Sequence, residues 1–77
     1  MKQTAKIFLG SIADVKDFVN LVIRYSSEVD LISDRYVVDA KSILGVFSLD
    51  LSKPITVSVD GADAAELMEA LTPYLAE

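Results

Sequence analysis

The side chains of this chain that could take part in chemistry are hydroxyls, carboxylates and amines, because the sequence contains neither histidine nor cysteine. Histidine is the commonest general base, and cysteine is a common nucleophile. An enzyme built on this sequence would depend on Asp, Glu, Lys, Ser or Tyr, and no spacing groups these residues into a catalytic set. We therefore expect a protein that is not an enzyme, with no cofactor and no metal site.

Two serines stand where an anion or a phosphoryl group could be held. Ser11 follows Gly10 and lies three residues before Asp14, a pattern typical of a helix start. Ser42 directly precedes an apolar run. The simplest role of each hydroxyl is to cap a helix. A phosphate at such a position would meet free backbone N–H groups and the positive end of the helix dipole, so both serines are also candidate sites.

Large apolar residues follow Ser42 closely, at Ile43, Leu44 and Phe47. On a helix of about two turns they cannot all face one sheet. Part of the set should be exposed, and an exposed apolar patch with a polar rim marks a binding surface. The alternative that all three belong to the core stays open from the sequence alone.

The charge balance narrows the range of partners. Seven basic residues are scattered among twelve acidic ones, for a net charge of −5, which argues against nucleic acid. No apolar run approaches the roughly 18–20 residues of a membrane span, and no signal-type stretch follows Met1. We expect a cytoplasmic protein that does not insert into membranes. The absence of cysteine excludes disulfides and thiolate zinc sites.

The apolar periodicity predicts the elements that position these residues. Asp63 and Glu66 form a second capping-box pattern, and Leu67, Leu71 and Leu75 a helical stripe. The predicted elements are a strand over 5–9, a helix from Ser11 to near Ser26, hairpin strands over 29–32 and 36–39, a short helix over 43–49, a strand over 55–59, and a helix from Asp63 that kinks or ends near Thr72, before Pro73.

These elements predict one domain over residues 1–77, because no linker or repeat divides the chain. Their order is β-α-β-β-α-β-α. Four strands with all helices on one face give an α+β fold, an open-faced β-sandwich with a four-stranded antiparallel sheet.

Over residues 14–49, and again over 54–77, the sequence resembles the HPr phosphocarriers of the bacterial sugar phosphotransferase system. The most specific part is the run Ala-Lys-Ser-Ile-Leu-Gly-Val-Phe-Ser-Leu at 40–49, which looks like the segment around the family's regulatory serine. The connection at 50–53 looks shorter than the family's. The resemblance implies the same open-faced sandwich.

The resemblance also implies roles for residues of this segment. Ser42 matches the serine that an ATP-dependent kinase phosphorylates in many HPr proteins. Ile43, Leu44 and Phe47 match the exposed patch through which family members bind partner proteins, and Lys41 lies beside it.

The sequence departs from the family where the family carries its phosphate. Ser11 stands at the phosphorylated histidine, Ala13 stands at the neighbouring arginine, and Asp14 adds a negative charge. A serine phosphoester is too stable for the relay that the labile histidine phosphoramidate supports. We expect no phosphate transfer from phosphoenolpyruvate. This combination is similar to HPr homologues that lack the histidine and act only in carbon catabolite regulation.

Three hypotheses follow. The first is a regulatory module, switched at Ser42, that binds phosphotransferase-system or regulatory proteins, an HPr kinase among them, and exists as a monomer or weak homodimer. The second is a small metabolite-binding regulatory domain with an anion site at Gly10 and Ser11. The third and weakest is a phosphocarrier that uses Ser11.

Overall fold

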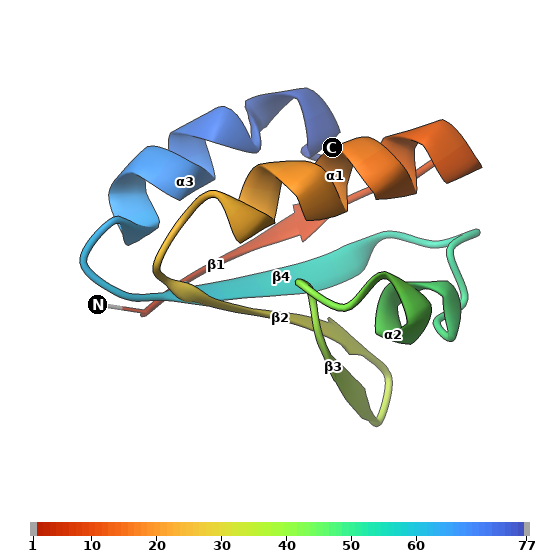
Figure 1. The fold of residues 1–77 in the computed structure, drawn as a ribbon. Coiled ribbons are helices and arrows are strands. Elements are labelled where there is room, and N and C mark those ends of the chain that lie inside the picture. The colour runs from red at the N-terminus through yellow and green to blue at the C-terminus, as the bar shows by residue number, and fades with distance from the viewer. Residues whose placement is uncertain (1, 77) are drawn as a thin grey trace.

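The computed structural model describes residues 2–76. Within this range four strands and three helices follow one another, and a 3-10 turn follows the last helix (Figure 1). They are β1 (Lys2–Ile7), α1 (Ile12–Ile23), β2 (Glu28–Ser33), β3 (Tyr36–Asp39), α2 (Ile43–Phe47), β4 (Ile55–Asp60), α3 (Ala64–Ala70) and η1 (Thr72–Tyr74). The predicted β-α-β-β-α-β-α order is confirmed.

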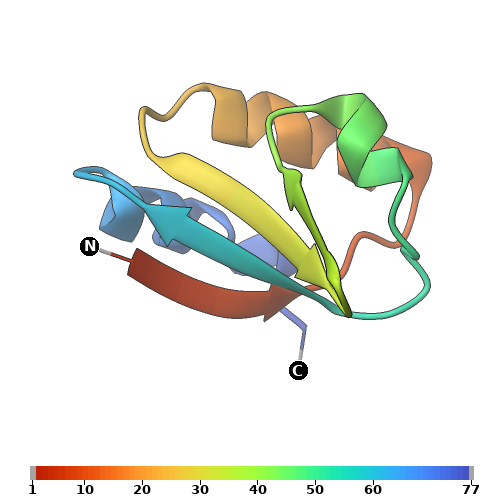
Figure 2. The ribbon, with the colours of Figure 1, turned by 90° about the horizontal axis from the view of Figure 1, so that it is seen from below.

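The strands form one sheet in the order β1-β4-β2-β3, and all neighbours are antiparallel. β4, the last strand in the sequence, therefore lies between the first two. α1 and α3 cover one face of the sheet, and α2 lies at its β3 edge (Figure 1). The other face is bare of helices and turned toward the viewer in Figure 2. The predicted open-faced antiparallel sandwich is confirmed.

The core lies between the sheet and the helices α1 and α3. Alternate residues of the central strands point into it because successive side chains of a strand face opposite sides. The fully buried side chains include Phe18 of α1, whose ring meets the Tyr74 ring edge-on with 5.8 Å between centroids. Other buried members are Ile7, Val15, Val22, Val29, Leu31, Val46, Ile55, Val57, Val59, Leu67 and Leu71.

The first strand begins and ends earlier than the predicted 5–9. β1 spans Lys2–Ile7 and pairs with β4 along its whole length, from Lys2 opposite Asp60 to Ile7 opposite Ile55. Leu9 lies beyond the strand but is still buried, because the chain enters the core before α1 begins. The two helices that flank the hairpin are also shorter than predicted: α1 ends at Ile23 and α2 at Phe47.

The predicted helix at the end of the chain is wrong in two details. Asp63 occupies the position before α3, but its side chain does not cap the helix. The predicted stripe also fails at Leu75, which is 45% exposed, whereas Leu67 and Leu71 are fully buried. The reason is that the helix ends at Ala70, and the chain then leaves through η1 to pair with β1, with Leu75 opposite Ile7.

Candidate functional site

The start of α1 is closed by its own side chains. The Ser11 hydroxyl accepts a hydrogen bond from the Asp14 amide at 3.1 Å, as the capping pattern predicts. The Asp14 carboxylate in turn accepts from the Gly10 amide at 3.2 Å. An anion bound at Gly10 and Ser11 would compete with this carboxylate for the amide and would be repelled by its charge. The geometry therefore gives no support to an anion site at the start of α1.

The segment before α2 leaves the Ser42 side chain accessible. Ser42 occupies the position before the helix, with an extended backbone, but its hydroxyl makes no capping hydrogen bond. The predicted capping contact is therefore wrong, although the position is right. α2 still begins here, because the Val46 amide donates to the Ser42 carbonyl at 3.0 Å. The residue is exposed.

The three apolar residues of α2 divide between core and surface. Leu44 is 80% exposed and Phe47 is 40% exposed, whereas Ile43 is half-buried and packs against the core. The buried member of this helix is Val46. This five-residue helix buries Val46 fully and Ile43 in part, and it leaves Leu44 and Phe47 exposed to solvent.

Lys41, the residue before Ser42, points back to the first helix. Its Nζ donates to the backbone carbonyl of Tyr25 at 2.8 Å, and its own amide donates to the Asp39 carboxylate at 2.9 Å. The last turn of α1 contains no basic residue. The Lys41 ammonium therefore supplies the positive charge that the carbonyl end of a helix favours. The structure places Lys41, Ser42, Leu44 and Phe47 in one continuous stretch, as the sequence predicts, but sends the lysine amine toward α1.

A polar contact that the sequence patterns missed joins two loops. The Asp63 carboxylate accepts from the amides of Ser26 and Ser27, at 2.8 and 3.0 Å, and from both serine hydroxyls. The Ser27 hydroxyl and then the Ser26 amide lower the pKa of Asp63 from 3.8 to about 2. Ser27 is buried, and Gly61 lies against it, so that a β-carbon on Gly61 would come within 2.7 Å of the Ser27 Cα. This contact ties the α1–β2 connection to the β4–α3 connection. Its partners are 36 and 37 residues apart, which no local spacing rule can detect.

Two further observations concern metal binding and membrane-spanning helices. Among residues 2–76, no group of three or more carboxylates is arranged to hold a metal ion. None of the helices in the same range is long and apolar enough to cross a membrane.

The fold and the exposed face of α2 define a class of protein: a small open-faced sandwich that presents a short apolar helix beside an accessible serine. A family model described as the PTS HPr component phosphorylation site matches residues 14–77. This chain belongs to the HPr family. The matched range begins after Gly10 and Ser11.

Individual relatives agree with this assignment. The chain is 39% identical over 62 residues to the HPr-like protein Crh of Bacillus subtilis, which is 78% of this chain and 73% of Crh. Its fold is similar to HPr-C-His of Thermoanaerobacter tengcongensis, with a TM-score of 0.79, 28% identity, and coverage of 95% of this chain and 88% of that one. It is also similar to the crystal structure of the Bacillus subtilis catabolite repression protein Crh, described as an intertwined, domain-swapped dimer, with a TM-score of 0.72, 34% identity, and coverage of 90% and 80%.

Proposed function

We propose that this chain is a regulatory, protein-binding member of the HPr family that does not carry phosphate on a histidine. The observation that supports this role most directly is the exposed Leu44 and Phe47 on α2, directly after an accessible Ser42. Partner proteins bind through this apolar surface, and phosphorylation of Ser42 changes which partners are bound.

The proposal rests on a simple electrostatic effect. A phosphoryl group on Ser42 would place close to two negative charges two residues from Leu44 and five residues from Phe47. An apolar surface that has acquired a double charge at its rim loses apolar partners and gains partners with a complementary positive group. Lys41 lies next to the modified residue and would feel the new charge first.

The absence of histidine supports the non-carrier half of the proposal. The Ser11 hydroxyl accepts a hydrogen bond from the Asp14 amide. Residue 13 is an alanine and supplies no positive charge for a phosphate. No histidine is available there as a general base, and the Asp14 carboxylate already accepts from the Gly10 amide. The nearest carboxylate, from Asp14, would repel an incoming phosphoryl group.

Mass spectrometry after two incubations tests the proposal. One sample contains phosphoenolpyruvate and the general enzyme of the phosphotransferase system, and the other contains ATP and an HPr kinase. We expect one phosphate in the second sample only, located on Ser42 and absent from Ser42→Ala. Acid-labile phosphate in the first sample would show a working carrier. If Ser42 stays unmodified in both samples, the proposed regulation by phosphorylation is wrong.

The docking surface has its own test, with the rate of Ser42 phosphorylation as the readout. Leu44→Ser should slow the reaction strongly, because the kinase would lose an apolar contact at the centre of the surface. Leu75→Ser is the matched control, since Leu75 is 45% exposed but pairs with β1, at the edge of the sheet opposite β3 and α2. Equal rates for the two variants would mean that α2 is not the docking surface. Sedimentation of the same proteins reports the assembly, which we expect to be a monomer or a weak homodimer.

A further inference from the structure

A hollow of about 580 Å³ lies at one end of the bare face of the sheet. In Figure 2 this is the right-hand end, where β1 and β2 end and β4 begins. Its lining comes from distant parts of the chain: Lys6 of β1, Ser33 at the end of β2, and Lys53, Pro54 and Thr56 around the start of β4. Small-molecule sites have volumes of about 300–1,000 Å³, so the hollow has room for a small metabolite. None of its lining residues belongs to α2 or to the start of α1.

The strand register sets the floor of the hollow. Thr56 of β4 lies opposite Lys6 of β1 on one side and opposite Ile32 of β2 on the other. All three side chains therefore share one row on the bare face. Ile32 is half-buried, and Pro54 and Ala76 add apolar surface beside it. The floor thus combines a hydroxyl with an apolar side chain that a hydrocarbon group could cover.

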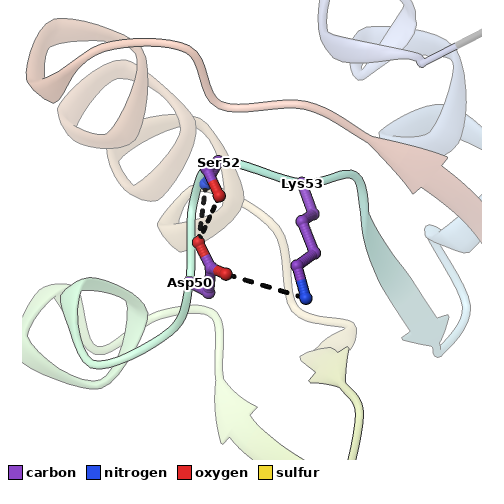
Figure 3. A network of polar contacts seen from close by, with 3 residues as sticks. All are labelled: Asp50, Ser52 and Lys53. Carbon is purple, nitrogen blue, oxygen red and sulfur yellow. Dashed lines mark hydrogen bonds and ion pairs between the residues drawn. The ribbon is translucent and has the colours of Figure 1, made fainter.

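Two amines stand at the rim, although the chain as a whole is acidic. Lys6 and Lys53 are two of its seven basic residues, and Asp34 is the one carboxylate in the lining among the described residues 2–76. The Lys53 Nζ lies 3.8 Å from an oxygen of Asp50 (Figure 3). That distance is an ion pair but is too long for a hydrogen bond, so the N–H groups of Lys53 stay available to another acceptor.

Asp50 is itself held in place. Its carboxylate accepts from the Ser52 amide at 3.0 Å and from the Ser52 hydroxyl at 2.5 Å (Figure 3). These hydrogen bonds lower the pKa of Asp50, so the carboxylate stays ionised. The fixed negative charge of Asp50 attracts the Lys53 amine without accepting a hydrogen bond from it.

We propose that this hollow binds a small organic anion, a carboxylate or a phosphate monoester. Its charged group lies between the amines of Lys6 and Lys53, and its hydrocarbon part covers Ile32 and Pro54. The Thr56 hydroxyl donates to an oxygen that the amines leave free. The site is independent of the proposed role of α2, because no residue of α2 lines it.

Phenyl phosphate and benzoate are suitable probes, since each joins an anion to a flat apolar group. We would titrate each into the ¹⁵N-labelled full chain and follow its amide resonances. Saturable shifts are expected at Ile32, Ser33 and Thr56, and phenyl phosphate should bind more tightly than inorganic phosphate, which lacks the ring. The stronger of the two probes then identifies the anion as a phosphate ester or a carboxylate.

Matched variants distinguish binding in the hollow from a general attraction of the anion to lysine side chains. Lys6→Gln and Lys53→Gln should each weaken phenyl phosphate by about threefold, the loss typical of one exposed charge pair. Lys2→Gln should leave the affinity unchanged, because Lys2 lies on the same strand and face, opposite Asp60 and away from the hollow. Equal weakening by Lys2→Gln, or no saturable shift around Thr56, would overturn the proposal. Shifts confined to Gly10 and Ser11 would also overturn it and would place the anion at the start of α1. None of these outcomes depends on phosphorylation of Ser42.

Discussion

At the scale of single residues, Asp63 forms the contact that links two distant loops. It stands at the start of a helix, yet its carboxylate serves a different segment and accepts the amides and hydroxyls of Ser26 and Ser27. Ser27 is buried, so removal of the carboxylate would leave polar groups without a partner inside the protein. Asp63 thereby joins two loops that the backbone alone does not connect.

The first prediction concerns the acid stability that Asp63 confers. Its pKa is about 2 in the folded protein, below the 3.8 of an unperturbed Asp. A lowered folded-state pKa stabilises the fold at pH values above the unfolded pKa, and this stability is lost as the pH falls from about 4 toward 2. Asp63→Asn should melt at a lower temperature than the parent at pH 6, and the difference should shrink as the pH approaches 2.

Thermal unfolding followed by circular dichroism at pH 6, 4 and 2 measures this effect. Glu66→Gln is the control, because Glu66 is an exposed carboxylate in the first turn of the same helix. A melting difference between Asp63→Asn and the parent that stays constant with pH would contradict the assignment.

The second prediction compares one substitution at two glycines. Gly61→Ala should destabilise the fold by about 1–3 kcal/mol, because the new methyl group would collide with the Ser27 backbone. Gly45→Ala should be neutral or stabilising by up to about 1 kcal/mol, since its methyl group would meet Ser42 and Val38 at an ordinary 3.6 Å and alanine favours a helix. Urea unfolding of both variants measures the difference in the free energy of unfolding. An equal loss of stability at both positions would contradict the prediction.

At the scale of elements, the side chain of Lys41 connects the segment before α2 to the end of α1. Lys41 stands before α2 but donates to the Tyr25 carbonyl at the end of α1. The third prediction is that Lys41→Met lowers the free energy of unfolding by about 0.5–1.5 kcal/mol, the net value of a single hydrogen bond. Hydrogen exchange should speed up at Arg24 and Tyr25 in particular, since these amides close the last turn of α1.

Lys16→Met provides the comparison for this variant. Lys16 is an exposed lysine in the second turn of α1, away from the end of the helix that Lys41 contacts. It should leave the exchange at Arg24 and Tyr25 unchanged. If both variants changed it alike, the effect would come from the overall charge and not from the contact with Tyr25.

The elements were largely predictable because apolar periodicity is local. Val15, Phe18, Val19 and Val22 recur at helical spacing and are all buried, and β3 spans the residues predicted for it. The start of β1 was missed because Lys2, Gln3 and Thr4 are all polar, so this part of the strand has no apolar alternation. The role of Asp63, the direction of Lys41 and the hollow near Thr56 depend on residues brought together by the fold, so no spacing in the sequence shows them.

At the scale of the whole molecule, the net charge of −5 opposes compactness. Part of this repulsion lies within the sheet, where Asp30 of β2 is directly opposite Asp39 of β3. Like charges in directly opposed positions destabilise a strand pair. Screening by salt should therefore stabilise the fold.

The fourth prediction follows from that charge. Raising sodium chloride from about 20 mM to about 0.5 M should raise the melting temperature by a few degrees, because the screening length then falls to a few ångströms. Chloride is the appropriate salt, since sulfate would also strengthen apolar burial and mask the effect. A melting temperature that fell with salt would mean that attractive ion pairs outweigh the repulsion.

The strand order of this fold also affects how the chain can be made. β4 separates β1 from β2, so neither of the two earlier strands has its main partner until residues 55–60 are available. During synthesis the first fifty residues can form α1 and the β2–β3 hairpin, but they lack the strand that joins the sheet. The emerging chain must therefore keep the apolar faces of α1 and β2 uncovered until residues 55–60 have been made, and during that time these faces are open to aggregation.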